Sequence, residues 1–351
     1  MKLNKKFDSE YIFKIAKKTD LKQIMNFLSI NWEPKNHILS KDIKFFLYEF
    51  LNKDNLNFFL ALDKKNNKIS ALQGFIPYSK NIFNSHICAS ITCVDFKSKT
   101  PFLGLETMIR MLHLLKPNTY CGIGTHPITM LPLVKKYLNR YTGKLTHFYL
   151  INKRVKKFKI ANLSKIDFSN ENYKITTFNH IYYKEIKSFN FLEKNFNFKK
   201  FQKLPFKSKW YINKRYFEHP IYKYKFFFIK NYKTNLCSLL VTRKINYKNS
   251  KIIRFVDYVG DIKDFVVIRE IANNLLFKEN IEYVDFYAAR LPRNIKNKIN
   301  FRTVREGDIN IIPDYFEPFV EKNVKIYFEA SNNKMVLFKA DADQDRPRLQ
   351  R

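Results

Sequence analysis

The stretch from Cys88 to Thr125 constrains the fold more than any other part of this sequence. An apolar, extended segment (CASITCVDF, 88–96) leads through the turn KTPFLGLETM (99–108) into an amphipathic helix that ends before Pro117. A second apolar segment, TYCGIGT (119–125), follows directly. Two strands joined through a helix lie parallel, and such a connection is right-handed. The sequence therefore predicts a parallel strand pair covered by a helix.

Gly104 lies where the first of these strands gives way to the helix. Glycine allows another group to approach the backbone closely, and the N-terminus of a helix attracts phosphate. A tight structural connection is the alternative, and spacing alone favours it.

The flanking segments extend this unit into a mixed α/β (α+β) sheet. Apolar periodicity predicts the following elements: strands over 11–16, 57–78 (as a hairpin) and 143–152, and helices over 20–32, 40–52 (behind a serine cap) and 127–139. A polar, basic stretch over 153–174 then connects to a second half with a similar strand and helix order. We predict two domains, 1–152 and 175–351, each a mixed, mostly antiparallel sheet flanked by helices.

The net charge of +34 on 351 residues raises the question of nucleic-acid binding. The excess is mostly lysine spread along the chain, and it accompanies abundant Asn, Ile, Phe and Tyr, as in proteins from AT-rich genomes. An arginine-rich arm, zinc-finger spacing and an RNP-like motif are all absent from the sequence. We therefore expect no nucleic-acid partner, but a solvated basic surface that favours anionic, phosphate-bearing ligands.

The cysteines predict no disulfide framework and no metal site. Cys88, Cys93, Cys121 and Cys237 form no CxxC pair, and the sequence holds no HExxH motif. Buried free thiols are typical of a reducing cytoplasm, where we expect this protein. The sequence contains no apolar run of about 18 residues, so we expect no transmembrane segment.

Most of the chain resembles a known family. The stretches that carry the resemblance are NWEPKNHILSKDIKFFLYEF, PFLGL, GKLTHFYLIN, KRYFEHPIYKY, IIPDYFEPF and FKADADQDRP. In this order they are similar to bacterial sugar N-acyltransferases built from two domains of the GNAT superfamily. The resemblance implies acyl transfer from acetyl-CoA or another short acyl-CoA to the amine of a nucleotide-linked amino sugar, such as a dideoxy amino sugar. The products of that family serve surface polysaccharides, including lipopolysaccharide O-antigen and capsule.

The resemblance also assigns a coenzyme A loop. In GNAT proteins, backbone amides between the fourth strand and the following helix hold the pyrophosphate. The matching positions are Phe102, Leu103, Gly104, Leu105 and Glu106. This loop has a single glycine, Pro101 removes one donor, and Glu106 adds a carboxylate, for which Lys97 and Lys99 would have to compensate.

Three residues are candidates for the base that deprotonates the amine: His37, Asp95 and His126. His126, directly before Pro127, fits a helix start better than a base. His37 lies between the first two predicted helices, where GNAT proteins usually bind the acceptor, and Asp95 ends the predicted fourth strand. A capping histidine and a turn aspartate are the structural alternatives. A bulge within 88–96 would free a backbone N–H for the thioester oxygen. Tyr137 and Tyr141 are off register for the general acid of the family.

The acceptor site is predicted in the second half and the tail. Arg215 can clamp a diphosphate, Tyr216 can stack on a sugar or base, and Asp343 and Arg346 lie in the terminal DADQDR. Core packing of Tyr216 and a frayed terminus are the alternatives. Two other functions stay open: acyl transfer to another amine, and a non-catalytic basic binding module.

Overall fold

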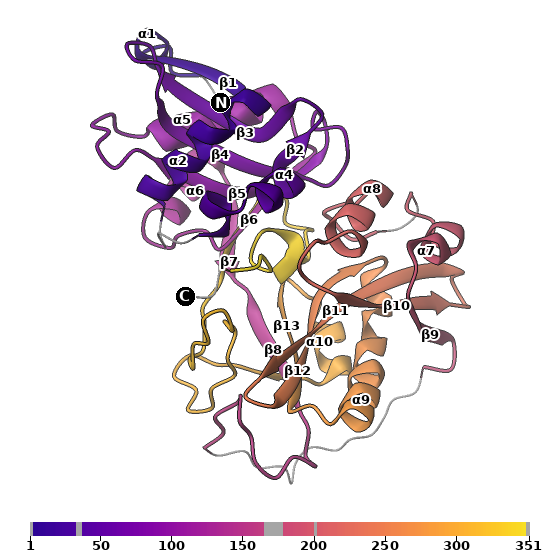
Figure 1. The fold of residues 1–351 in the computed structure, drawn as a ribbon. Helices are drawn as coiled ribbons and strands as arrows, with labels where there is room; N and C mark the ends of the chain where they lie inside the picture. The colour runs from indigo at the N-terminus through magenta and orange to yellow at the C-terminus, as the bar shows by residue number, and fades with distance from the viewer. Residues whose placement is uncertain (1–2, 33–36, 165–177, 200–201, 349–351) are drawn as a thin grey trace. The chain divides into compact units, whose positions relative to one another are not determined.

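The computed structural model describes residues 3–32, 37–164, 178–199 and 202–348. The chain divides into two compact units, which we call unit 1 (1–142, 328–333 and 346–351) and unit 2 (143–327 and 334–345). Each unit is built on a mixed sheet of eight strands with helices packed against it (Figure 1). The predicted fold class is confirmed.

The first sheet has the strand order β1-β3-β4-β5-β6-β15-β7, with β2 paired to β3. Its elements are α1 (Phe7–Glu10), β1 (Tyr11–Lys17), α2 (Leu21–Asn31), α3 (Ile38–Lys41), α4 (Ile43–Phe50), β2 (Leu51–Asn52), β3 (Asn55–Asp63), β4 (Ile69–Pro77), β5 (His86–Val94), α5 (Leu103–Leu115), β6 (Thr119–Ile123), α6 (Met130–Leu138), β7 (Tyr141–Lys144) and β15 (Tyr327–Ala330). Strands β5 and β6 run parallel, whereas β1–β3, β2–β3, β3–β4, β4–β5 and β6–β15 are antiparallel pairs.

Both faces of the first sheet are covered because neighbouring residues of a strand point to opposite sides. Phe59 of β3 packs into a core with α5 and α6. Phe58, the preceding residue, stacks on Phe46 of α4 with ring centroids 5.4 Å apart. Helix α4 begins later than predicted, since the Asp42 carboxylate, and not Ser40, accepts the capping hydrogen bond from the Phe45 N–H.

The second sheet has the order β14-β8-β13-β12-β11-β10-β9, with β16 paired to β13. Its elements are β8 (Thr146–Ile151), β9 (Ile181–Ile186), α7 (Phe189–Asn195), α8 (Lys209–Ile212), a π-helical turn (Asn213–Phe217), β10 (Tyr224–Asn231), β11 (Leu236–Tyr247), β12 (Ser250–Val259), a 3₁₀ segment (Ile262–Val267), α9 (Ile268–Glu279), β13 (Tyr283–Ala289), α10 (Arg293–Ile299), β14 (Arg302–Thr303) and β16 (Leu337–Phe338). The core of this unit packs α9 and α10 against β12 and β13.

The units exchange strands along the chain. Strand β8 pairs with β13 and β14 of the second sheet, although the predicted first domain (1–152) contained it. Strand β15 pairs with β6 of the first sheet, although the predicted second domain (175–351) contained it. The division in the structure therefore differs from the predicted boundary at residue 152. The reason is that β8 joins the second sheet and β15 joins the first.

The predicted connection over 153–174 is described only as far as residue 164, and 165–174 lie outside the described residues. Its described part is anchored to unit 2, because the Glu282 carboxylate accepts hydrogen bonds from the N–H groups of Lys159, Ile160 and Ala161. Among the helices that the structure describes, we find none with the length and apolar character that crossing a bilayer requires.

Candidate functional site

Strands β5 and β6 of unit 1 start side by side and then separate. Their parallel ladder runs from His86–Thr119 to Cys88–Cys121. Just beyond it, the pairing of β5 with β4 shifts, so that Gly74 alone faces both Ser90 and Ile91. This is a β-bulge, and it lies within 88–96, where a bulge would free a backbone N–H. A bulge takes its extra residue out of the ladder, here at the point where the parallel strands diverge.

Helix α5 starts close to this divergence with its first turn uncapped. Phe102 precedes it in a left-handed conformation (φ 63°), and its side chain makes no capping hydrogen bond. The first N–H groups of an α-helix have no partner within the helix. The predicted coenzyme loop therefore ends in a helix N-terminus with free donors, which favours a negatively charged group.

Gly104 has a packing reason of its own. A Cβ atom at this position would lie 2.8 Å from Cγ2 of Val94 on β5. Helix α5 therefore approaches β5 more closely than a side chain would allow. Gly104 therefore makes a tight connection between β5 and α5, which is the structural interpretation of this residue.

The Glu106 carboxylate does not face the helix N-terminus as an isolated charge. Its Oε1 accepts a hydrogen bond from Nε of Arg110 at 2.7 Å and another from the Asn4 N–H at 3.2 Å. A pocket of about 420 Å³ lies beside this first turn; its lining includes Phe102, Leu105, Glu106, Ile109 and Tyr137. The charge that Glu106 adds to the predicted loop is thus paired with a cation.

The base candidates His37 and Asp95 have local structural roles. Nδ1 of His37 accepts a hydrogen bond from the Leu39 N–H and caps α3. Burial, with the charges of Arg346 and Arg348, lowers the pKa of His37 to about 3. Oδ1 of Asp95 accepts from the Lys97 N–H in the turn after β5. These positions match the capping and turn alternatives of the sequence analysis.

Arg346 lies in unit 1 beside the bulge. Its Nη2 donates to the Ser90 hydroxyl at 2.7 Å, and its Nε donates to Oε2 of Glu49 at 2.8 Å. Sequence analysis did not single out Glu49. A signal was present, because the buried face of α4 consists of Phe45, Phe46 and Phe50 with this one acid among them.

Unit 2 also contains two parallel strands that diverge, β12 and β13, but here a further strand, β16, lies between them. β12 and β13 run parallel from Ile253–Val284 to Phe255–Phe286, and the pairing of β12 with β11 shifts between Val241 and Thr242. Strand β16 then pairs with Ala288 and Ala289 of β13. Because β8 occupies the other edge of β13, β16 lies in the gap toward β12. The second divergence is therefore filled by the chain itself.

Buried charge pairs hold this closed arrangement together. Nζ of Lys207 lies 2.5 Å from carboxylate oxygens of both Asp257, on β12, and Asp341. Burial alone would lower the pKa of Lys207, but the two carboxylates outweigh it and raise the pKa. Nζ of Lys203 lies 3.5 Å from Asp341, so two ammonium groups face two carboxylates and the charges of this buried cluster balance.

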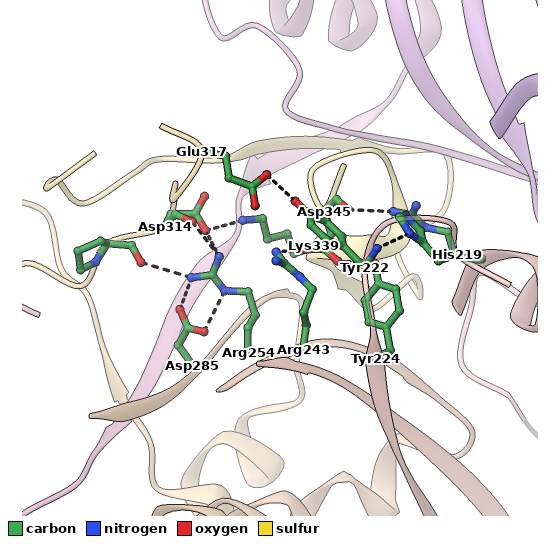
Figure 2. A network of polar contacts seen from close by, with 12 residues as sticks. His219, Tyr222, Tyr224, Arg243, Arg254, Asp285, Asp314, Glu317, Lys339 and Asp345 are labelled. Atoms are coloured by element: carbon green, nitrogen blue, oxygen red, sulfur yellow. Dashed lines mark hydrogen bonds and ion pairs between the residues drawn. The ribbon is translucent and has the colours of Figure 1, made fainter. Parts of the chain in front are cut away.

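A second network crosses unit 2 further along the same strands (Figure 2). Arg254 of β12 donates to both carboxylate oxygens of Asp285 on β13, at 2.9 and 2.6 Å. Asp314 accepts from Arg254 and Lys339, and Asp345 accepts from Arg243 at 2.7 Å. Figure 2 shows these cations and carboxylates pointing toward one another, which again pairs the buried charges.

The predicted acceptor residues of unit 2 lie within or beside these networks. Arg215 is buried, and its Nη2 lies 3.5 Å from the carbonyl oxygen of Asp345. The buried hydroxyl of Tyr216 donates to Asp257 at 2.6 Å, and its ring packs edge-on against Tyr224. Asp343 is half-buried and accepts from Gln344. Tyr216 therefore occupies the core position considered as its alternative.

Metal chemistry was not expected from the sequence. Within residues 3–32, 37–164, 178–199 and 202–348, no three His, Cys, Asp or Glu side chains gather in a way that could hold a metal ion.

No family model matches this sequence, and no curated protein matches it. The solved structures with a similar fold include two that are described as GCN5-related N-acetyltransferases. The protein from Anabaena variabilis is 8% identical with a TM-score of 0.50, over 92% of this chain and 73% of its own. The protein from Kribbella flavida is 7% identical with a TM-score of 0.50, over 92% of this chain and 71% of its own. Both units of this chain therefore have the fold of the GCN5-related N-acetyltransferases.

Proposed function

We propose that this protein transfers an acyl group from acetyl-CoA or another short acyl-CoA to an amine, and that unit 1 holds the reaction. The observation that carries the proposal is the divergence of β5 and β6, with a bulge at Ser90–Ile91 and the uncapped N-terminus of α5 beside it. Such a site offers donors for a pyrophosphate and an amide for the thioester oxygen. The fold shared with proteins named as N-acetyltransferases supports it.

Within this proposal, coenzyme A binds at Phe102–Glu106 with its phosphates toward the first turn of α5. The pocket of about 420 Å³ beside that turn accommodates part of the cofactor. The amine attacks the thioester carbon, and much of the rate comes from holding the two reactants together. We further propose a nucleotide-linked amino sugar as the acceptor, because a chain of net charge +34 attracts an anionic acceptor and repels a polyamine.

A thiol-release assay tests both parts of the proposal. The purified protein is mixed with acetyl-CoA or a short hydroxyacyl-CoA and with dTDP-, UDP- or GDP-linked amino sugars. The same nucleotide sugars with a hydroxyl in place of the amine serve as controls. We expect free coenzyme A only with an amino sugar. Release of coenzyme A with other amines would show that the acceptor is not an amino-sugar nucleotide. If the protein neither releases nor binds coenzyme A, the transferase proposal fails and a basic binding module takes its place.

A charge-reversal pair locates the coenzyme site. Lys99 lies in the turn before α5, and Lys65 lies in the turn between β3 and β4; both are exposed. Lys99→Glu and Lys65→Glu change the net charge equally, but only the first places a carboxylate near the proposed phosphates. We expect Lys99→Glu to weaken coenzyme A binding by roughly 3- to 10-fold at low salt, and Lys65→Glu to leave it within about twofold. Isothermal titration calorimetry measures both, and equal effects would contradict the assignment.

A further inference from the structure

Glu49 is a buried carboxylate on an otherwise aromatic helix face. It is 6% exposed, and its neighbours on the buried side of α4 are Phe45, Phe46 and Phe50. Burying a charged group costs free energy unless the group is paired and hydrogen-bonded. Only half of this carboxylate is satisfied: Oε2 accepts from Nε of Arg346, while Oε1 is buried and finds no hydrogen-bond partner among the described residues.

One guanidinium connects this carboxylate to the bulge of β5. Arg346 donates through Nε to Glu49 and through Nη2 to the Ser90 hydroxyl, and Ser90 is one of the two residues that form the bulge. The Glu49 carboxylate therefore lies within the width of one guanidinium group from the strand position where a backbone amide leaves the ladder. Arg346 is itself buried, so this geometry is held away from bulk water.

The base candidates His37 and Asp95 from the sequence each accept a local backbone hydrogen bond. The Nδ1 lone pair of His37 binds the Leu39 N–H, and Oδ1 of Asp95 binds the Lys97 N–H. Glu49 lies one guanidinium away from the bulge, and its buried Oε1 has no hydrogen-bond partner among the described residues. The charged group that contacts Glu49 is Arg346, whose positive charge, with that of Arg348, also acts on His37.

We propose that Glu49 is the general base of the acyl transfer and that Arg346 is its positioning residue; this rests on the function proposed for unit 1. The acceptor's amine nitrogen attacks the thioester carbon, a C–N bond forms, and the C–S bond breaks. The proton lost from nitrogen passes to Oε1 of Glu49. It then moves to the departing thiolate, which leaves as free coenzyme A and returns Glu49 to the carboxylate form.

The test compares Glu49→Gln, Glu49→Asp and Glu185→Gln in the full chain. The amide keeps the size and the hydrogen bonds of the carboxylate but accepts no proton. We expect Glu49→Gln to lower kcat by about 100-fold or more while the Kd for coenzyme A stays within about twofold. Its residual rate should rise steadily with pH, as the acceptor amine deprotonates in solution. Glu49→Asp should recover part of kcat. Glu185 of unit 2 is exposed, and Glu185→Gln should leave kcat unchanged.

The possible outcomes distinguish the role of Glu49 from the acyl-transferase function proposed for unit 1. If the wild type turns over and Glu49→Gln binds coenzyme A but retains more than about a tenth of kcat, Glu49 is not the base and the transferase assignment stands. If Glu49→Gln loses activity with a pH profile parallel to that of the wild type, its role is structural and the inference is overturned. If the wild type neither binds coenzyme A nor releases it from acyl-CoA, both proposals fail together.

Discussion

Two buried glutamates of unit 1 differ in how closely an arginine approaches their carboxylates. Glu49 is bound by the Arg346 guanidinium, whereas Glu329 on β15 lies near Arg140 without an ion pair in the described residues. Burial raises the pKa of Glu329 to about 7, although the charge of Arg140 opposes the shift. Near neutral pH the fold therefore holds this carboxyl partly protonated, at a position next to Gly122 of β6.

Stability should depend on pH through Glu329. Its pKa of about 7 in the folded chain exceeds the ordinary 4.5, so the native state binds this proton more tightly than the unfolded state. The contribution of Glu329 to the free energy of unfolding is therefore complete below about pH 4.5 and is lost as the pH rises toward 7. We expect Glu329→Gln to match the wild type at pH 5 and to exceed it at pH 8, by up to about 3 kcal/mol.

Urea unfolding at the two pH values measures this difference in the free energy of unfolding, with Glu185→Gln as an exposed control. A gap between Glu329→Gln and the wild type that stays constant from pH 5 to pH 8 would contradict the assignment.

At the scale of elements, the contact of α5 with β5 sets the geometry of the candidate site. The helix lies so close to the strand that a Cβ at Gly104 would reach Val94 at 2.8 Å. This closeness brings the N-terminal turn of α5 to the strand that carries the bulge. The same contact therefore determines both the packing of the helix and where its free N–H groups are presented.

Gly104→Ala should strain that contact. Val is branched at Cβ and moves little, so we expect a loss of about 1–3 kcal/mol in the free energy of unfolding. Val94→Ala removes the opposing methyl groups, and the double variant should be less destabilised than the sum of the two single variants. A double-mutant cycle from chemical denaturation measures this coupling. Strict additivity would show that α5 shifts to accommodate the methyl group.

The sequence could predict this element pair because its information is local. The apolar period, Pro117 and the run from Cys88 predict β5, α5 and β6 within a few residues of their observed bounds. The same periodicity identifies Thr146–Ile151 as a strand but contains nothing about which sheet it joins. Alternation specifies the two faces of a strand and leaves its neighbours open. The exchange of β8 and β15 between the units was therefore beyond local reasoning.

The candidate site was predictable to a smaller extent. Sequence and family resemblance placed the loop Phe102–Glu106 at a helix N-terminus and Arg346 among the functional residues. Glu49 was missed because an acid within FFLYEF matches the periodicity of a helix, and only tertiary contacts reveal which side it faces. The pairing of Glu106 with Arg110 and Asn4 likewise depends on a contact across a long stretch of sequence.

At the scale of the whole molecule, two similar units differ in what occupies their diverging strands. In unit 2, β16 pairs with β13 in the gap, and Lys207 is fixed between Asp257 and Asp341. In unit 1, the described residues place no strand between β5 and β6 beyond Cys88 and Cys121. The strand that fills the divergence in unit 2 therefore has no counterpart among the described strands of unit 1.

If the function proposed for unit 1 holds, each chain should bind one molecule of acyl-CoA. Isothermal titration calorimetry with coenzyme A, or with acetyl-CoA in the absence of an acceptor, should give a stoichiometry near one. Lys99→Glu should weaken that single binding event. Two equivalent sites per chain would mean that β16 leaves the gap in solution and would contradict the division of roles between the units.

The strand exchange also has a consequence for synthesis of the protein. A chain leaving the ribosome folds from its N-terminus as soon as its partners are available. Strand β6 emerges early, but β15, which pairs with its outer edge, is translated only after nearly all of unit 2. Until then the nascent first sheet presents an unpaired edge, the kind of surface that invites aggregation and chaperone binding. The first sheet is therefore completed only after nearly all of unit 2 has been translated.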